Sequence, residues 1–425
     1  MKILKPIIFT ALFLCFANDV FADEMISVRL RNYIGNTSEL SLRLQGEHLT
    51  LDPALNLMEG NEYKLSIKGK KLFLHQGKSK MRVAKPFILY PKEYDEEHLV
   101  YINDRPYMGA IEFQIEEKNN IRPVNQLLLE DYLKGVVPFE VFPSWDIEAL
   151  KAQTLAARTY TITHKDAELD DTIHYQVYGG YNEFAKTKQA VRDTKGEIIT
   201  FENKPISTFY SASNGGMTES NKNVWGGEPT PYFPIKSDPY DPIQPWSFTL
   251  DKTQIDLEEI NWDDSNWWDQ LEEKNKEITA SMKNWLQNNG YIGDIKILSI
   301  PHFSIEKGKN ESSRSVKGSF QMEFMRKLFD GTILFEKLSY DDVELKKIRP
   351  IIGGIHFKSY LISTFDSSAD SYKVSGKGNG HGVGMSQWGA SIMADKGKNY
   401  KEIIEHYYPG TEIEVYESTE EMVNH

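Results

Sequence analysis

A strand-like alternation near the start of the chain is the feature that most constrains its fold. Between residues 27 and 104, β-branched and aromatic residues recur with polar ones in the runs SVRLRNY, LSLRL, YKLSI, KLFLH and LVYIND. The turn-forming clusters GNTSE, GEH, KGK and QGKSK separate these runs. This pattern is typical of antiparallel strands joined by short loops, so we predict a β-rich accessory domain over residues 23–115.

The residues before this unit resemble a secretory signal peptide. Lys2 and Lys5 precede an apolar run over residues 7–17, and the small residue Ala22 offers a cleavage site. The run is shorter than the ~20 residues of a membrane-spanning helix. We therefore predict a signal peptide over residues 1–22 and a secreted, extracytoplasmic protein of the cell envelope. Membrane contact is expected only if the leader stays uncleaved as an anchor.

Charge and cysteine content narrow the class of protein. The only cysteine, Cys15, lies in the leader, so the mature chain has no disulfide. Without residues 1–22 the formal charge of −13 becomes −14, because Lys2, Lys5 and Asp19 are lost. Such an acidic chain is not expected to bind nucleic acid. The 425 residues exceed what one hydrophobic core usually serves, which predicts two or three domains.

Two segments far apart in the sequence carry the candidate chemistry. In DYLKGVVPFEVFPSW (residues 131–145), Glu140 lies between two prolines, in what we predict to be a loop. In GKGNGHGVGMSQWGA (residues 376–390), glycines surround His381. We expect each segment to lead into a helix, the first capped by Ser144 and the second by Ser386, and the two segments to form one site.

The sequence leaves the protonation of Glu140 open. A position just before a helix N-terminus favours the charged carboxylate, whereas burial among valines and phenylalanines favours the neutral acid that a general acid needs. A solvated or salt-bridged loop carboxylate is the structural alternative.

Five blocks in order resemble the stage II sporulation protein D and amidase-enhancer family. They are EDYLKGVVPFEVFPSW, EALKAQTLAARTYTITH, HYQVYGG, FYSASNGGMTES and GHGVGMSQWGASIMADKGKNYKEIIEHYYPGTEI, and the resemblance runs from about residue 105 to about residue 413. One such block alone is a weak signal, but five in order are a strong one.

The resemblance implies a peptidoglycan lytic transglycosylase with Glu140 as its only acid/base. Such an enzyme cuts between N-acetylmuramic acid and N-acetylglucosamine and leaves a 1,6-anhydromuramyl end, without water and without a cofactor. Ordinary glycosidases need two carboxylates, and the sequence offers no compelling second one. The family also implies an alternative, a glycan-binding protein that enhances a cell-wall amidase without cutting. A wall-binding scaffold built on the β-rich unit is a third reading.

The resemblance further implies a glycan-binding groove. Its candidate residues are Lys151, Gln153, Arg158, Tyr178, Ser213, Gly215, His381 and Gln387. Arginine and glutamine donate to sugar oxygens, and glycines let a polymer approach the backbone. Structural alternatives stay open: Gln153 and Arg158 as residues that tie neighbouring loops, Tyr178 as core, and His381 as a helix-capping residue.

Some family members bind zinc through a histidine and a cysteine near the block that reads HYQVYGG here. This chain has Tyr175 beside His174 in that neighbourhood, and it has no mature cysteine. His164 and His174 also lack a tight ligand spacing such as HExxH. We therefore predict no metal site.

The remaining chain completes an α+β fold. We predict a mixed catalytic domain over residues 116–415, interrupted by a helical insertion at about residues 247–300, and a flexible tail over residues 416–425. In the insertion, Ser265 is expected to cap one helix that carries Trp268 and Trp285. We expect these tryptophans to be helix core; exposed, they would suggest sugar stacking.

Overall fold

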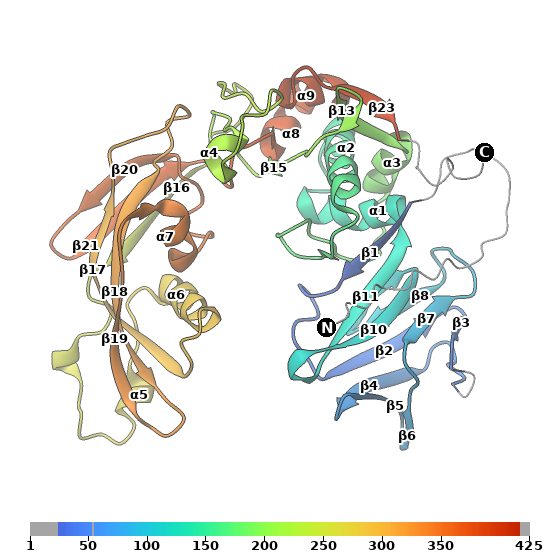
Figure 1. Ribbon diagram of the computed structural model, residues 1–425, viewed down its shortest axis with the longest axis horizontal. Helices are drawn as coiled ribbons and strands as arrows, with labels where there is room; N and C mark the ends of the chain where they lie inside the picture. The colour runs from blue at the N-terminus through green and yellow to red at the C-terminus, as the bar shows by residue number, and fades with distance from the viewer. Residues whose placement is uncertain (1–23, 53–54, 417–425) are drawn as a thin grey trace.

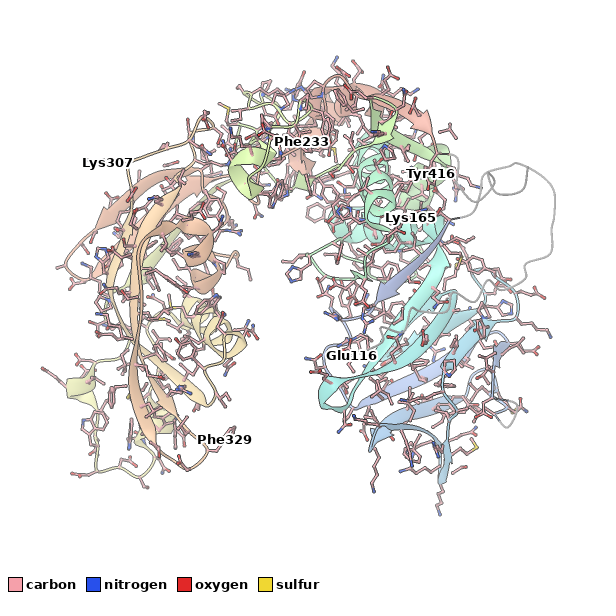
Figure 2. The ribbon with its side chains drawn as sticks, in the orientation of Figure 1. Glu116, Lys165, Phe233, Lys307, Phe329 and Tyr416 are labelled. Carbon is pink, nitrogen blue, oxygen red and sulfur yellow. The ribbon has the colours of Figure 1, made fainter. Side chains whose placement is uncertain are left out.

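The computed structural model describes residues 24–52 and 55–416. Two lobes stand side by side and a bridge joins them at one end, so the chain forms an arch (Figure 1). In Figure 2, Glu116 lies toward the free end of the first lobe, Phe329 at the free end of the second, and Phe233 at the bridge. No described helix is long and apolar enough to cross a membrane. The predicted signal peptide and all but the first residue of the predicted tail lie outside the described residues.

Two six-stranded sheets build the lower part of the first lobe. One has the order β12 (Leu169–Asp170), β1 (Met25–Arg29), β11 (Asn120–Leu128), β10 (Ala110–Glu116), β7 (Phe87–Pro91) and β3 (His48–Thr50). The other has the order β6 (Ser79–Arg82), β5 (Lys71–Gln76), β4 (Glu62–Lys68), β2 (Glu39–Gln45), β8 (Leu99–Ile102) and β9 (Arg105–Met108). Every second residue of β2, namely Leu40, Leu42 and Leu44, is buried, as the alternation predicts.

The β-rich part and the part that follows it share one sheet and one core. Strands β10 and β11 form an antiparallel hairpin around a 3-10 turn at Glu117–Asn119, so the boundary predicted between residues 115 and 116 falls inside this hairpin. Strand β11 also pairs with β1. The same core contains Ile26 of β1 and Ala157, which lies far along the chain. The described residues of the β-rich part, 24–52 and 55–115, are therefore packed as one body with the helices around Glu140.

Helices stack above these sheets. They are α1 (Leu129–Glu140), α2 (Ile147–His164), α3 (Ala185–Asp193), α8 (Gln387–Asp395) and α9 (Tyr400–Tyr407). A small sheet accompanies them, in the order β14 (Lys204–Pro205), β13 (Glu197–Phe201) and β23 (Glu412–Val415). Helix α2 is the central one, because it contacts α1, α3, α8, α9 and β13. Ser386 caps α8 by accepting from the Gly389 amide at 3.0 Å, as predicted.

Two local predictions around Glu140 are wrong. Glu140 is the last residue of α1 and not a loop residue. The next helix begins after Asp146, whose side chain accepts from the Glu148 amide at 2.9 Å, so Asp146 and not Ser144 is the N-cap. Pro138 misled the prediction: a proline disfavours helix interiors, yet α1 accommodates it within its last turn.

The second lobe has its own core between two three-stranded sheets and two helices. The sheets have the orders β16 (Pro245–Asp251), β21 (Ser371–Lys377), β20 (Ile362–Ser367) and β17 (Asp294–Ile305), β18 (Lys317–Lys327), β19 (Ile333–Glu344). The helices that pack on this core are α6 (Lys276–Asn288) and α7 (Leu345–Ile352), and α5 (Trp267–Gln270) and a 3-10 turn at Leu257–Glu259 lie nearby. Met282, Phe320 and Ile348 are fully buried there.

The helical insertion predicted at about residues 247–300 is only part of this lobe. That range begins and ends in strands β16 and β17, and it holds two helices, α5 and α6, in place of the single predicted one. Their N-caps are Asn266 and Asn275, so the predicted cap at Ser265 is wrong. Trp268 is buried and Trp285 packs against the lobe's core, as the core interpretation of these tryptophans expects.

The bridge holds the elements that connect the two lobes. A two-stranded parallel pair, β15 (Tyr210–Ser211) and β22 (Met385–Ser386), joins the block FYSASNGGMTES to the segment that carries His381, with the short helix α4 (Asn221–Trp225) beside them (Figure 1). Gly384 lies where an added Cβ would come within 2.0 Å of the Phe209 carbonyl oxygen, and its φ is +73°. Only glycine permits this close approach of the two segments.

Candidate active site

A cleft of about 850 Å³ lies where the two lobes meet the bridge. Helix α1 contributes Glu140, and the bridge contributes His381 and Gln387. Arg349 of α7 comes from the second lobe. The same cleft is lined by further rings and polar groups of all three parts: Tyr160, His174, Tyr175, Phe209, Tyr210, Glu219, Trp225, Asn310, Arg314, Glu344, Lys346, Tyr360 and Asn379.

Glu140 is held at the base of this cleft by two hydrogen-bond donors. Its Oε1 accepts from the Val177 amide at 2.7 Å, and Gln387 also hydrogen-bonds to it. Burial raises the pKa of Glu140, and these two donors oppose the rise without cancelling it. Its place at the C-terminus of α1 acts in the same direction as burial, because the negative end of the helix dipole disfavours a carboxylate. The fold therefore favours a protonated Glu140.

The Val177 amide is positioned by the residue before it. The Nε2 of Gln176 donates to Thr161 Oγ1 of α2 at 2.8 Å, and its Oε1 accepts from the Tyr210 hydroxyl at 2.9 Å. Gln176 is buried, so both bonds are shielded from water. This buried amide ties the 175–177 segment to α2 and to the bridge, and thereby fixes the donor that faces Glu140.

Tyrosine side chains surround the carboxylate with neutral hydroxyl groups. Burial raises the pKa of Tyr160 to about 12, with smaller contributions from Tyr175 and Glu140. Burial also raises the pKa of Tyr210 well above its usual value, and Glu140 contributes. Both hydroxyls are therefore protonated near neutral pH. The Tyr210 hydroxyl already donates to Gln176, so Tyr160 is the one that can donate to an oxygen in the cleft.

Gln387 and Gln153 form a pair behind Glu140. Gln387 is the first residue of α8, and its Nε2 donates to the Oε1 of buried Gln153 at 3.4 Å. The Nε2 of Gln153 has no hydrogen-bond partner among the described residues. Gln153 therefore orients Gln387 from α2 and does not itself line the cleft.

His381 lines the cleft as a neutral imidazole. Burial, with smaller contributions from Arg314 and Arg349, lowers the pKa of His381 to about 4, although a backbone hydrogen bond with Tyr210 opposes this shift. Its Nδ1 accepts from the Val383 amide at 3.0 Å, which places the ring proton on Nε2. His381 does not cap α8, because Ser386 does.

Arg158 lies away from the cleft. It is fully buried and forms a two-pronged ion pair with Glu130, with both N–O distances at 2.8 Å. It also donates to the Glu197 carbonyl at 3.1 Å. These bonds tie α2 to the start of α1 and to β13, so the structural interpretation of Arg158 holds in this geometry.

Four other candidate residues also make contacts within the protein and do not line the cleft. Lys151 pairs with Glu148 at 3.1 Å and with Asp193 at 3.3 Å. The Tyr178 hydroxyl is buried and donates to Asn125 Oδ1 at 2.8 Å. Buried Ser213 donates to Asp241 at 2.8 Å. A Cβ added at Gly215 would come within 2.8 Å of Leu361, so this glycine serves close packing. The structure brings Glu140, His381 and Gln387 together in the cleft and leaves the other candidates outside its lining.

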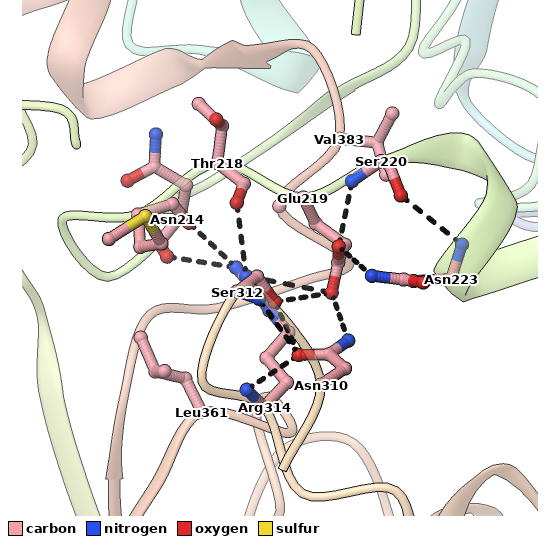
Figure 3. Close-up of polar contacts among 12 residues, drawn as sticks. Asn214, Thr218, Glu219, Ser220, Asn223, Asn310, Ser312, Arg314, Leu361 and Val383 are labelled. Atoms are coloured by element: carbon pink, nitrogen blue, oxygen red, sulfur yellow. Dashed lines mark hydrogen bonds and ion pairs between the residues drawn. The ribbon is translucent and has the colours of Figure 1, made fainter. Parts of the chain in front are cut away.

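The motifs missed the residues that join the bridge to the second lobe. Glu219 is buried and accepts from Ser220 N, Asn223 Nδ2, Asn310 Nδ2 and Ser312 Oγ, while Arg314 lies 3.8 Å away (Figure 3). Glu219 stands in the block FYSASNGGMTES, but its partners in the second lobe, Asn310 and Ser312, are about ninety residues further on. The local spacing of residues in the sequence does not predict such a long-range contact.

The described residues contain no group of three histidine, cysteine, aspartate or glutamate side chains that could hold a metal ion. His174 and Tyr175 line the cleft without a third such ligand beside them. The expected absence of a metal stays a prediction.

The fold and the cleft define a two-lobed α+β protein whose shielded carboxylate lies among rings and hydrogen-bond donors. A family model described as Stage II sporulation protein matches residues 117–201. The chain is 36% identical over 389 residues to the amidase enhancer of Bacillus subtilis (strain 168), covering 91% of this chain and 54% of that protein. It is 28% identical over 312 residues to stage II sporulation protein D of the same organism, covering 68% of this chain and 75% of that protein.

An uncharacterized protein of Brachyspira hyodysenteriae is 34% identical over 326 residues, which cover 74% of this chain and 74% of that protein. The chain therefore belongs to the stage II sporulation protein D family, as its motifs predict. It spans about half the length of the B. subtilis amidase enhancer.

Proposed function

We propose that this protein is a secreted lytic transglycosylase that cuts peptidoglycan glycan strands in the cell envelope. The observation that carries the proposal is Glu140, a single carboxylate with a raised pKa in a cleft of polymer-binding size. A general acid must hold a proton at the working pH, and burial acts in that direction here because it raises the pKa of Glu140. The family membership supports a substrate in the bacterial cell wall.

The other carboxylates of the cleft favour one acid/base over two. Among the described residues that line it, only Glu219 and Glu344 are also acidic. Glu219 is saturated by four hydrogen bonds, and Glu344 forms an ion pair with Lys346 at 2.6 Å. A hydrolase would need a second free carboxylate to activate water or to attack the sugar.

In the proposed reaction, protonated Glu140 donates its proton to the oxygen of the bond between N-acetylmuramic acid and N-acetylglucosamine. The bond from the muramyl anomeric carbon to that oxygen breaks, and the glucosamine product leaves with the proton. The muramyl C6 hydroxyl then attacks the anomeric carbon and gives its proton to Glu140. The product is a 1,6-anhydromuramyl end, no water is consumed, and Glu140 returns to its protonated state.

The surrounding donors have defined parts in this proposal. The Val177 amide holds one oxygen of Glu140 and Gln387 binds the carboxylate, so its orientation is fixed. These two hydrogen bonds also stabilise the carboxylate that exists between the two steps. The neutral hydroxyls of Tyr160 and Tyr210 do not compete for its proton.

A second candidate function rests on the similarity to the protein named amidase enhancer. In this alternative the cleft binds a glycan strand, the partner is a cell-wall amidase, and no bond is cut. The raised pKa of Glu140 favours the enzyme, because a binder gains nothing from a proton held there.

Mass spectrometry of released fragments tests the proposal. Mature protein and the Glu140→Gln variant are incubated with intact peptidoglycan and with peptidoglycan stripped of stem peptides by an amidase. We expect 1,6-anhydromuramyl ends with the native protein and at least about a hundredfold fewer with Glu140→Gln, the lower end of the usual range for a general acid. Glu344→Gln is the matched control, since it removes a cleft carboxylate that the proposal does not use. Absence of fragments from both substrates would favour the amidase-enhancing alternative.

A further inference from the structure

One tryptophan of the cleft is half-exposed although large apolar side chains are usually covered. Trp225, at the end of α4, keeps 51% of its surface exposed and lines the cleft together with Glu140. By contrast, Trp268 in the second lobe is 3% exposed. An exposed aromatic ring inside a concave site that also carries polar groups is a typical binding feature.

Two other rings of the protein pack against the ring of Trp225. Its centroid lies 4.4 Å from that of Phe209 and 5.2 Å from that of His381. Phe209 in turn contacts Tyr160, at 6.2 Å between centroids, and Tyr160 is electrostatically coupled to Glu140. A continuous row of rings therefore runs from the neighbourhood of the carboxylate to Trp225.

The short helix that carries Trp225 is fixed by the buried Glu219 cluster. Ser220 caps α4 by accepting from the Asn223 amide at 3.3 Å, and the Asn223 side chain donates to Glu219 at 2.9 Å (Figure 3). Asn310 and Ser312 of the second lobe donate to the other oxygen of Glu219. A five-residue helix has little stability of its own, so these bonds hold Trp225 in place.

We propose that Trp225 is a stacking platform for one pyranose ring of an N-acetylated hexosamine, in a subsite next to the bond that Glu140 cuts. The axial C–H groups of a pyranose form an apolar face that matches an indole ring, while its hydroxyl and acetamido groups point outward at the rim. Asn379 and Tyr360 also line the cleft, and they can offer amide and hydroxyl groups to these sugar substituents. The subsite rests on the proposed function in that both need a glycan in the cleft.

A rigid platform is also a reason for the bridge to contain the buried carboxylate of Glu219, whose burial costs free energy. A preorganised aromatic loses little conformational freedom when a ligand binds, which increases affinity. The platform sets how the strand lies and thus which sugar bond reaches Glu140. Trp225 is in this sense a positioning residue for the strand and takes no part in the bond changes.

Binding without cleavage tests the subsite. In the Glu140→Gln background, isolated peptidoglycan glycan strands and N-acetylglucosamine oligomers are titrated by calorimetry against Trp225→Ala, Trp225→Phe and Trp262→Ala. We expect roughly tenfold weaker binding for Trp225→Ala, by analogy with aromatic stacking on bases, and near-native binding for Trp225→Phe. Trp262 is the matched control, because it is 49% exposed but absent from the lining of the cleft.

The outcomes separate the subsite from the proposed reaction. Weaker binding in Trp225→Ala supports the subsite even if the native protein releases no fragments. Unchanged binding in Trp225→Ala overturns the subsite even if the native protein cuts glycan. An equal loss in Trp262→Ala would also overturn it, since the effect would then not belong to the cleft. Circular dichroism spectra of the variants confirm that each is folded.

Discussion

At the scale of single residues, the fold decides the direction in which the pKa of Glu140 shifts. The sequence alone left two opposing influences, a helix N-terminus and an apolar setting. The structure rules out the influence of a helix N-terminus, because Glu140 is the last residue of α1 and does not lie at the N-terminus of α2. Burial and the C-terminal end of the dipole then act together, and the pKa rises.

This raised pKa predicts a pH-dependent stability. A carboxyl group whose pKa is raised by folding favours the folded state at pH values below its usual pKa of 4.5, and this contribution is lost as the pH rises through the raised value. Glu140→Gln keeps an acceptor for the Val177 amide but cannot ionise. We expect its midpoint of thermal unfolding to exceed that of the native protein by more at pH 7 than at pH 4.

Calorimetry at the two pH values measures this difference. Glu344→Gln controls for the loss of one cleft carboxylate. Equal differences between Glu140→Gln and the native protein at both pH values would mean that burial does not hold the proton on Glu140.

Sequence reasoning reached part of the site and missed another part for a physical reason. Glu140, His381 and Gln387 stand in sequence segments marked by glycines and prolines, and the cleft contains all three. Their roles stay predictions. Arg158 and Tyr178 stand in equally distinctive blocks but are buried in the core. A motif marks a position that the fold constrains, and it does not distinguish a ligand contact from a buried ion pair.

At the scale of elements, α2 organises the first lobe through buried polar contacts. Arg158 joins it to α1 and β13, and Thr159 Oγ1 accepts from the Ile199 amide of β13 at 2.9 Å. These bonds orient α1 and therefore Glu140 at its end. The periodic pattern of α2 predicted a helix, but it did not show that nearly every side of that helix is covered.

The Arg158–Glu130 ion pair predicts a large stability effect. Arg158→Met leaves Glu130 without its partner, and breaking a buried pair in this way costs about 3–5 kcal/mol. Lys276→Met, which breaks an exposed ion pair with Glu272, is expected to leave the stability nearly unchanged. Urea unfolding measures both values. A near-native stability of Arg158→Met combined with lost glycan binding would instead place Arg158 among the ligand-binding residues.

At the scale of the whole molecule, the arch is the feature that the sequence did not reveal. The α+β class is confirmed, and the strand pattern of the first lobe follows from its alternation. The second lobe was expected as a helical insertion with the main domain resuming after it. Its strands pair across long separations, such as Trp246 with Gly376, and such pairing has no local signature.

The Glu219 cluster predicts how firmly the lobes are held. Glu219→Ala removes the acceptor for four donors and leaves buried Arg314 without its nearest negative charge. We expect a loss of about 3–5 kcal/mol in stability and a larger radius of gyration in small-angle X-ray scattering, because the lobes then sample more orientations. Glu311→Ala is the matched control, since exposed Glu311 also accepts from Asn223, at 3.1 Å. Scattering that is unchanged in a folded Glu219→Ala variant would show that other contacts hold the arch.

The central claim is that Glu140 cuts a glycan strand without water. Digestion of peptidoglycan in water labelled with a heavy oxygen isotope tests this claim most directly. The new muramyl ends are analysed by mass spectrometry. The account predicts anhydro ends that carry no heavy oxygen, and their loss in Glu140→Gln. Muramyl ends that carry heavy oxygen would contradict it, because water would then have attacked the sugar and a second catalytic group would be required.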